Sequence, residues 1–598
     1  MTKLIRFLKP YIWQIVILLI LTYLQVMATL ALPDYMAKII NNGISGKDIG
    51  LVWHDGFWML GISLAGAACA VGAGYLASKI ATGFSRDLRE SVFSRIESFS
   101  LVEFNKFSTS SLITRSTNDI QQIQMVVIML LRMVLSAPIM AVGAVFKAYH
   151  MAPSMSWIIA LAVVVMFGII GVIFSIAMPK FELLQKLVDK LNLVTRQNLT
   201  GLRVVRAFNN ETIEEEKFDK VNKDLTDTNL FVNRLMVIMQ PLMTLIFNFT
   251  TIGIIWYGAK LIGNGTLQIG DMLAFMQYAM QVIMSFLMIS IIFIMVPRAS
   301  VSGKRIAEVI ETLPLITDPK NPVKVDGKGI GLVEFKDVTF SYPGAESPVI
   351  SNISFTAKPG ETTAFIGSTG SGKSTIINLI PRFYDVTSGS VSIDGVDVRD
   401  FKLEDLYRKI GYVPQRSVLF SGTIKSNITY GNQSATDSEI AKAVKTSQAE
   451  DFIGKTEKSL ETSIAQAGAN ISGGQKQRLS IARALVKKPE IYIFDDSFSA
   501  LDLKTDSALR KALENETKDR TVLIIGQRIS TIMNADNIIV FEGGKICGQG
   551  RHEQLIKSCE VYREIASSQL SDEELKNIGL SLHEVDKTVM ELTQKESV

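Results

Sequence analysis

The sequence predicts a membrane α-helical domain with six spans, followed by an α/β domain built around a phosphate-binding loop (P-loop). The chain has 598 residues, of which 47% are hydrophobic and 20% charged, and its mean hydropathy is +0.25. This average conceals a change along the chain, because residues 1–300 are dominated by apolar runs and residues 320–598 resemble a soluble domain. Length alone would suggest about four domains, but the long apolar runs and one glycine-rich octet predict two large units.

Six stretches reach the length of about 20 apolar residues that a helix needs to cross a bilayer. The first is too long for the apolar run of a signal peptide, and further spans follow it. The loops at 79–126 and 179–234 are long, charged and helical in pattern. The predicted spans are residues 11–33, 56–78, 127–148, 155–178, 235–262 and 271–296.

Basic residues beside the spans predict the orientation, because cytoplasmic loops carry an excess of Lys and Arg. The N-terminus has Lys3, Arg6 and Lys9 without an acidic residue. The two long loops carry Lys79, Arg86, Arg89, Arg95, Lys180, Lys186 and Lys190. We therefore expect a multi-pass protein of the cell membrane, in contact with lipids, with its N-terminus and its second half in the cytoplasm.

Charge and cysteine content exclude other classes. A net charge of +4 on 598 residues gives no reason to expect a nucleic-acid partner. The cysteines Cys69, Cys547 and Cys559 lack the spacing of a metal site or a disulfide framework. We expect them to be inert thiols in a reducing compartment.

The second half contains a P-loop in the required strand–loop–helix context. A short strand over residues 361–366 precedes the octet, and an apolar helix follows it. Glycines let backbone N–H groups close around phosphate oxygens, and the helix N-terminus adds partial positive charge. The lysine is expected at the β- and γ-phosphates of ATP, and the serine hydroxyl on Mg²⁺. The expected nucleotide-binding residues are Gly367, Ser368, Thr369, Gly370, Ser371, Gly372, Lys373, Ser374 and Thr375.

A second motif, made of Ser472, Gly473, Gly474 and Gln475, precedes an apolar helix. It resembles the signature motif of ATP-binding cassette (ABC) proteins, and the resemblance extends over nearly the whole chain. Six spans followed by one cassette look like a half-transporter of the ABC exporter type. In that family two cassettes face head to tail, and each ATP lies between the P-loop of one and the signature motif of the other.

The resemblance implies roles for further residues. Tyr342 matches the aromatic that stacks on adenine, and Gln415 matches the glutamine that senses Mg²⁺ and the γ-phosphate. Asp495 matches the Mg²⁺-linked aspartate, so that the implied metal ligands are Ser374, Gln415 and Asp495. Residues 499–502 match the loop that crosses the seam between cassettes.

Two residues depart from the family pattern inside this site. At Asp496 the family usually has glutamate, which polarises the attacking water, and aspartate is shorter by about 1.5 Å, one C–C bond. A misplacement near 1 Å can lower a rate about 100-fold. At Gln527 the family usually has histidine, and a neutral amide offers less to the charge of the transferring phosphoryl group. Gln466 is a third departure, at a position where exporters often have glutamate.

These departures predict a site that binds ATP well and cleaves it poorly, with Asp496, Gln527 and Gln415 as its catalytic residues. The intact signature motif can still complete a partner's site. The chain thus resembles the degenerate-site subunit of bacterial heterodimeric multidrug exporters: an ATPase coupled to export of hydrophobic or amphipathic compounds, paired with a second half-transporter. The alternatives are a homodimeric lipid or peptide exporter, and a nucleotide-gated channel or regulatory ATP sensor.

The predicted domains are a six-helix domain at 1–300, a linker at 301–331, a cassette at 332–567 and a tail at 568–598. The cassette is expected to contain an inserted helical subdomain near 416–490 and a small β subdomain. Residues 110–119 and 201–208 resemble the coupling helices of exporters, which dock on cassettes. The tail is amphipathic and could cap the cassette or remain unpacked.

The last spans hint at the cargo. Met276, Met280, Met284 and Met288 repeat at i+4 spacing and form one stripe, and Met236, Met239 and Met243 lie in the fifth span. Methionine adapts to many apolar shapes, so that the stripe could line a drug cavity or simply pack against helices and lipid. Arg132 in the third span is expected to reach the membrane interface, and no acidic residue interrupts a predicted span.

Overall fold

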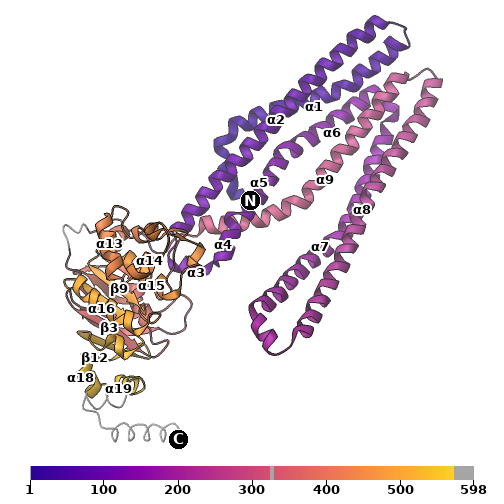
Figure 1. The fold of residues 1–598 in the computed structure, drawn as a ribbon. Helices are drawn as coiled ribbons and strands as arrows, with labels where there is room; N and C mark the ends of the chain where they lie inside the picture. Colours follow the sequence, from indigo (N-terminus) through magenta and orange to yellow (C-terminus); the bar gives the residue numbers. More distant parts are fainter. Residues whose placement is uncertain (1, 324–328, 571–598) are drawn as a thin grey trace. The chain divides into compact units, whose positions relative to one another are not determined.

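The computed structural model describes residues 2–323 and 329–570 of the chain. It consists of two compact units: Met1–Glu97 with Ser108–Thr312, and Ser98–Phe107 with Leu313–Val598. The predicted amphipathic tail lies outside the described residues, apart from its first turn. Figure 1 gives the order of the elements along the chain.

The first unit consists of long helices. Six helical stretches of its described residues are long and apolar enough to cross a membrane, which confirms the predicted number of spans. Because a helix rises about 1.5 Å per residue, the 52 residues of α7 exceed the thickness of the hydrocarbon core of a bilayer more than twofold. The main helices are α1 (Ile12–Lys38), α2 (Ile49–Glu97), α4 (Thr109–Ser116), α5 (Asn118–Met129), α6 (Leu135–Met151), α7 (Ser156–Ala207), α8 (Glu211–Gly263) and α9 (Ile269–Glu311).

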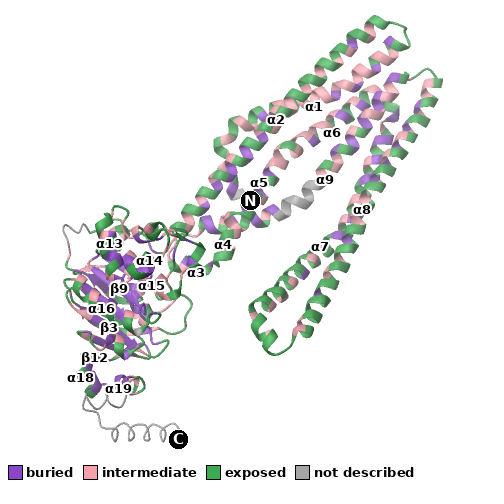
Figure 2. Cartoon of the chain, viewed as in Figure 1, coloured by how far each residue is buried: buried purple, intermediate pink, exposed green. Residues whose placement is uncertain are grey.

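Most of the spanning surface is not covered by the chain itself. Only 11% to 39% of the most apolar window of each span is buried, and the exposed residues run along the helices in Figure 2. Trp13, Trp58 and Trp256 are among the exposed apolar side chains. Lipid or another subunit must cover this surface, because an isolated helix bundle in water would bury it.

A polar cluster lies where α1, α6 and α9 meet. Asp34 of α1 accepts hydrogen bonds from Lys147 Nζ at 2.6 Å and from the Tyr278 hydroxyl at 2.6 Å. The expectation that no acidic residue interrupts a span is therefore wrong at this position, because α1 continues beyond residue 33 to Lys38. Intramembrane charges are usually paired in this way.

The second unit contains two principal sheets. The smaller has the order β2-β1-β4-β5 and the larger the order β12-β11-β3-β10-β9-β6. The core of the larger sheet is parallel, so that the carboxyl ends of β3, β10, β9 and β6 meet at one edge. The strands are β1 (Val333–Phe340), β2 (Ile350–Ala357), β3 (Thr362–Gly367), β4 (Ser388–Ile393), β5 (Val396–Asp397), β6 (Ile410–Val413), β9 (Ile491–Asp495), β10 (Thr521–Ile525), β11 (Asn537–Glu542) and β12 (Lys545–Gly550).

Helices cover and extend this sheet. A helical group falls inside the predicted insertion at 416–490: α12 (Ile424–Thr429), α13 (Asp437–Thr446), α14 (Glu450–Gly454) and α15 (Gly473–Val486). The short strands β7 (Gly422–Thr423) and β8 (Ser463–Ile464) pair within it. The other helices are α10 (Lys373–Leu379), α11 (Leu403–Lys409), α16 (Leu503–Glu516), α17 (Ile529–Ile532), α18 (His552–Ser558) and α19 (Glu560–Ser567).

A segment of the first long loop belongs to the second unit. The short helix α3 (Leu101–Lys106) is closed by a capping box between Ser100 and Glu103. Glu103 is buried, and its Oε1 accepts a hydrogen bond from the Leu315 backbone at 3.2 Å. Asn105 Nδ2 donates to the Tyr384 hydroxyl at 3.3 Å. The docking segment of this loop is therefore α3.

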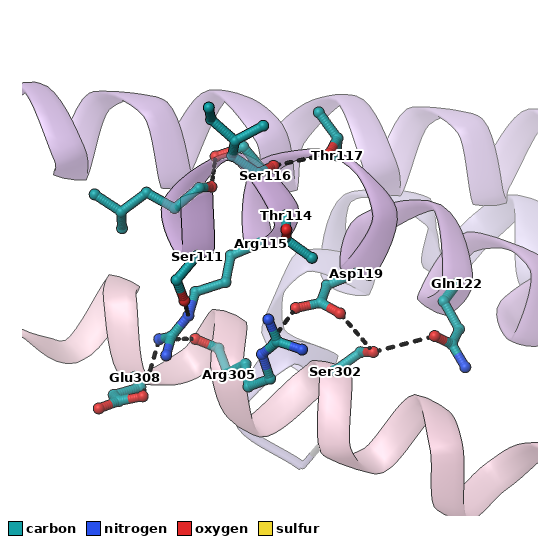
Figure 3. A network of polar contacts seen from close by, with 12 residues as sticks. Ser111, Thr114, Arg115, Ser116, Thr117, Asp119, Gln122, Ser302, Arg305 and Glu308 are labelled. Atoms are coloured by element: carbon teal, nitrogen blue, oxygen red, sulfur yellow. Dashed lines mark hydrogen bonds and ion pairs between the residues drawn. The ribbon is translucent and has the colours of Figure 1, made fainter. Parts of the chain in front are cut away.

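The predicted docking segment at residues 110–119 belongs to the first unit. These residues form α4 and the start of α5 in the first unit, where they bind the end of α9 (Figure 3). Arg115 Nη1 donates to Glu308 at 2.9 Å, and buried Asp119 accepts from Ser302 Oγ at 2.9 Å. Helix α9 also continues to Glu311, so that the predicted linker at 301–331 begins as helix.

Candidate functional site

The P-loop joins β3 to α10. Gly370 has φ +83° and Gly372 has φ +96°, a region that side chains with a Cβ rarely adopt. The loop wraps around the lysine ammonium: Lys373 Nζ donates to the carbonyls of Gly367 at 2.8 Å and Ser368 at 2.6 Å. Burial lowers the pKa of Lys373 below its ordinary value, while the carboxylates of Asp496 and Asp495 oppose that shift. This cradle is built for a polyanion, because it holds a cation beside a helix N-terminus.

Oxygen ligands gather beside the cradle. Ser374 Oγ lies 3.4 Å from Asp495 Oδ1, at the end of β9. Burial raises the pKa of Asp495 to about 6. A cation bound beside Asp495 would lower this pKa again, because it favours the charged carboxylate. Among the described residues no group of three or more His, Cys, Asp or Glu could hold a metal. One carboxylate, one hydroxyl and one amide instead fit Mg²⁺, which is usually bound by one or two carboxylates together with substrate phosphates.

Asp496 sits at the centre of the site in a left-handed backbone conformation, with φ +46°. Its carboxylate Oδ2 accepts hydrogen bonds from Gln415 Nε2 at 3.2 Å and from Gln527 Nε2 at 2.8 Å. Gln415 follows β6 and Gln527 follows β10, so that the two amides approach from loops on different strands. Burial raises the pKa of Asp496, although the Gln415 hydrogen bond and the charges of Arg528 and Lys373 act in the opposite direction.

Tyr342 lies beside the helix that carries the P-loop lysine. Its hydroxyl is 3.1 Å from the Thr375 hydroxyl. Its ring meets the edge of Tyr384, with ring centroids 5.2 Å apart and an interplanar angle of 89°. Tyr384 in turn accepts the hydrogen bond from Asn105 of α3.

The signature-motif residues form the start of a different helix, α15. Ser472 and Gln475 close a capping box there. Gly474 is close to the loop at 499–502, since a Cβ on it would lie 3.2 Å from the Ala500 carbonyl. Buried Gln477 of α15 contacts the Gln415 loop, donating to the Pro414 carbonyl at 3.4 Å.

The structure thus brings most predicted site residues together and leaves one group apart. Lys373, Ser374, Asp495, Asp496 and Gln527 share one site. Ser368, Thr369 and Ser371 belong to its loop, and Gln415 reaches it from β6. Ser472, Gly473, Gly474 and Gln475 stand at the start of α15.

Some residues of this region carry no sequence signal. Tyr384 follows α10, and Asn105 lies in α3, which is distant in the sequence. Gln569, which follows α19, donates to the Gln527 carbonyl at 3.0 Å. Only the folded chain brings these residues to the site.

Comparisons with known proteins agree with this geometry. A family model described as "ABC transporter transmembrane region" matches residues 15–286, and one described as "ABC transporter" matches residues 350–499. An uncharacterized ABC transporter ATP-binding protein of Mycobacterium tuberculosis is 41% identical over 96% of this chain and 98% of its own length. The chain belongs to the ABC transporter family.

Further relatives narrow the class within this family. The uncharacterized ABC transporter ATP-binding protein YfiB of Bacillus subtilis is 37% identical over 96% of this chain and 99% of its own length. An ATP-dependent lipid A-core flippase of Syntrophus aciditrophicus is 32% identical over 86% of this chain and 85% of its own. A bacterial Atm1-family ABC exporter solved with ATP bound has a TM-score of 0.78 and 25% identity, covering 94% of this chain and 99% of that one.

The chain is therefore an ABC exporter half-transporter with a multi-pass membrane domain and an ATPase domain coupled to transport. ABC exporters work as dimers of such halves. The first unit is the transmembrane domain, and the second unit is the cassette.

Proposed function

We propose that this ABC half-transporter is the weakly hydrolysing half of a heterodimeric exporter of hydrophobic compounds. The observation that supports this proposal is the state of Asp496, whose Oδ2 accepts hydrogen bonds from two neutral amides. In the family the acid at this position polarises the attacking water. A carboxylate that is shorter by about one C–C bond, about 1.5 Å, and is held in place by these amides reaches that water poorly.

The binding side of the site is intact. Backbone N–H groups of the P-loop and Lys373 would hold the β- and γ-phosphates, and Tyr342 would stack on adenine. Ser374, Asp495 and Gln415 would hold Mg²⁺, which neutralises phosphate charge when bound. The site therefore keeps every group needed for tight nucleotide binding.

The cleaving side is weakened twice. Asp496 lacks one methylene relative to glutamate, which shortens its reach by about 1.5 Å. Gln527 offers a neutral N–H where a histidine can offer a cation, and charge-assisted hydrogen bonds are about twice as strong as neutral ones. Both changes reduce stabilisation of the transition state rather than binding of the ground state.

Pairing with a different half-transporter would explain how a chain with intact ATP binding and weak ATP cleavage can still drive transport. The capping box at Ser472 presents an ordered helix start, as expected for a signature motif that completes the partner's site. The partner would supply an effective acid and histidine with its own P-loop. One ATP would then act mainly as a clamp while the other is turned over.

The turn between α7 and α8 would dock on the partner's cassette, in the cytoplasm. Val204 and Phe208 beside this turn are 61% and 72% exposed, and Ile213 at the start of α8 is 50% exposed. Apolar side chains at the far end of two long helices call for a covering surface. If the turn docks on a cassette, the turn and the cassette lie on the same side of the membrane, which we propose is the cytoplasmic side.

A cavity of about 440 Å³ supports hydrophobic cargo. It lies between α8 and α9, and methionine side chains dominate its wall. Methionine is adaptable and polarizable, which suits a surface that accepts many apolar shapes. The lining residues are Met236, Met239, Gln240, Met243, Thr244, Phe247, Met280, Ile283, Met284 and Leu287. Exposed Arg132 lines a separate cavity of about 500 Å³ together with Gln25 and Ser136.

A homodimeric lipid exporter is the second candidate. It is favoured by the similarity to proteins named as lipid A-core flippases. Proteoliposomes separate the two, because a drug exporter accumulates an apolar dye and a lipid exporter moves a labelled lipid between leaflets.

The test of the proposal compares the purified chain with the chain co-purified with a second half-transporter. The lone chain should bind ATP, fail to bind it after Lys373→Ala, and turn it over very slowly. The mixed dimer should hydrolyse rapidly, and Asp496→Asn should change its rate little. Rapid hydrolysis by the lone chain that Asp496→Asn abolishes would contradict the proposal.

A further inference from the structure

Gln569 spans the loop that carries Gln527. Its side-chain Nε2 donates to the Gln527 carbonyl at 3.0 Å, and its Oε1 accepts from the Ile529 backbone N–H at 2.8 Å. One side-chain amide thus holds the backbone on both sides of Arg528. The two partners lie 42 and 40 positions away in the sequence.

The loop needs such a partner because the following helix has no cap of its own. Helix α17 is four residues long, and its N-cap residue Arg528 makes no side-chain cap hydrogen bond. The first N–H groups of a helix have no partner inside the helix. Gln569 supplies the acceptor for the N–H of Ile529, as a capping side chain would.

Both ends of this bridge are fixed by one hydrophobic cluster. Ile529 and Ile532 of α17 are buried in it, and so are Tyr562 and Ala566 of α19. Tyr562 also bonds to His552 of α18, with 2.7 Å between its hydroxyl and Nδ1. The exposed Gln569 side chain therefore starts from an anchored backbone and reaches a loop anchored beside it.

The chain of contacts then continues to the catalytic carboxylate. Gln569 holds the backbone of Gln527, and Gln527 Nε2 donates to Asp496 Oδ2 at 2.8 Å. A loop that loses its backbone partners gains freedom, and displacement of a catalytic group near 1 Å can lower a rate about 100-fold. Gln569 itself touches neither Asp496 nor the P-loop through these bonds.

We infer that Gln569 is a positioning residue for ATP hydrolysis, which places the Gln527 amide on Asp496 by clamping residues 527–529 from the end of α19. The inference rests on the ATPase activity of the family and not on the identity of the partner. The segment that follows α19 would then act on the nucleotide site indirectly, through Gln527.

The test uses the full-length chain in detergent or nanodiscs, with phosphate release from radiolabelled ATP as the rate assay. Gln569→Met keeps the length of the side chain and removes both hydrogen bonds. It should lower kcat about fivefold, the factor that corresponds to losing the one neutral hydrogen bond that Gln527 donates to Asp496. KM for ATP should stay within about twofold, because the P-loop is untouched. Gln549→Ala, which removes an exposed glutamine on β12, is the matched control and should change neither constant.

Two further measurements separate positioning from a general structural role. Hydrogen exchange of the peptide over residues 526–532 should accelerate in Gln569→Met, while the peptide of α15 stays protected. In a Gln527→Ala background, Gln569→Met should lower kcat no further, because the two residues act in series. Gln569→Glu keeps the acceptor for Ile529 and loses the donor to Gln527, so that it should retain the protection of Ile529 with a lowered kcat.

An unchanged kcat in Gln569→Met, or a full fivefold effect that persists without the Gln527 side chain, would overturn the inference. Either result would leave the proposed weak hydrolysis standing. Conversely, fast hydrolysis by the lone chain would end that proposal and leave this test intact.

Discussion

Gln527 Nε2 donates a 2.8 Å hydrogen bond to Asp496 Oδ2, so that the two residues that depart from the family pattern inside the nucleotide site contact each other directly. We propose that each departure weakens ATP hydrolysis, and their contact joins them into one structural unit. The Gln527 side-chain amide thus restrains the Asp496 carboxylate. The contact therefore fixes the position of the shortened Asp496 side chain.

The contact predicts that repairs at the two positions are coupled. Asp496→Glu should raise the ATP turnover of the lone chain about tenfold or more, because it restores the reach of the acid. Gln527→His should add a smaller gain alone than in the Asp496→Glu background. Steady-state phosphate release over the four combinations gives the coupling. Strictly additive gains would show that the contact has no catalytic consequence.

The stability of the protein should depend more on the buried contacts at the end of α9 than on the exposed ones. Asp119 is buried and binds Ser302 Oγ and, at 3.3 Å, Arg305 Nε. Asp119→Ala should destabilise the protein by about 1–3 kcal/mol, because it leaves Ser302 and Arg305 without this hydrogen-bonding and charge partner. The control is Glu308→Gln, whose 46% exposed side chain pairs with Arg115 and should matter by less than about 1 kcal/mol.

Thermal unfolding in detergent measures both variants. Figure 3 shows Asp119 and Glu308 in the same polar network, so that the two variants test neighbouring sites of one helical junction. Equal shifts in the two midpoints would contradict the assigned roles.

The methionine cavity should set cargo preference. Met280→Ala combined with Met284→Ala removes two side chains from its wall. The relative transport of apolar dyes of different shape should change, while basal ATPase activity stays the same. Met178→Ala, at an exposed methionine of α7, is the control. Unchanged transport of every dye would remove the cavity from the cargo path.

The cassette should lose stability in mild acid through His552. Burial lowers the pKa of His552 below its ordinary value of 6.5, although Glu553 acts in the opposite direction. Its Nε2 is buried without a hydrogen-bond partner in the part of the chain that the structure describes. The unfolded chain therefore takes up a proton before the folded one does. The stability contributed by neutral His552 is complete above the ordinary pKa and is lost as the pH falls through the folded pKa.

The thermal midpoint of the full-length protein measures this effect. Between about pH 7 and about pH 5.5 it should fall more steeply for the native protein than for His552→Gln, which cannot titrate. Parallel pH profiles would show that His552 carries no part of the acid sensitivity.

The nucleotide site could be predicted because its residues follow directly on strands. Asp495 ends β9, the P-loop follows β3 and Gln527 follows β10, and parallel neighbours bring their carboxyl ends together. The sequence alone therefore identified the residues that meet. It did not reveal that Gln527 holds Asp496, because that depends on side-chain direction.

The docking helix α3 and the Gln569 bridge could not be predicted, for a different reason. Residues 101–106 form a single short helix inside a charged loop, and the polar segment at 110–119 resembles a loop tip more strongly. Glu103 reveals its role only through its bond to the Leu315 backbone, 212 positions away. Gln569 is an exposed amide without any local pattern. Such contacts are set by packing between distant segments rather than by periodicity.

The most direct test of the central claim is single-turnover ATP cleavage by the site that Lys373 lines, measured in the assembled transporter with the partner's own catalytic acid substituted. We expect tight binding with cleavage about 100-fold slower than at the partner's site in the reciprocal arrangement. We also expect Asp496→Glu to close most of that gap. Equal rates at the two native sites would contradict the account.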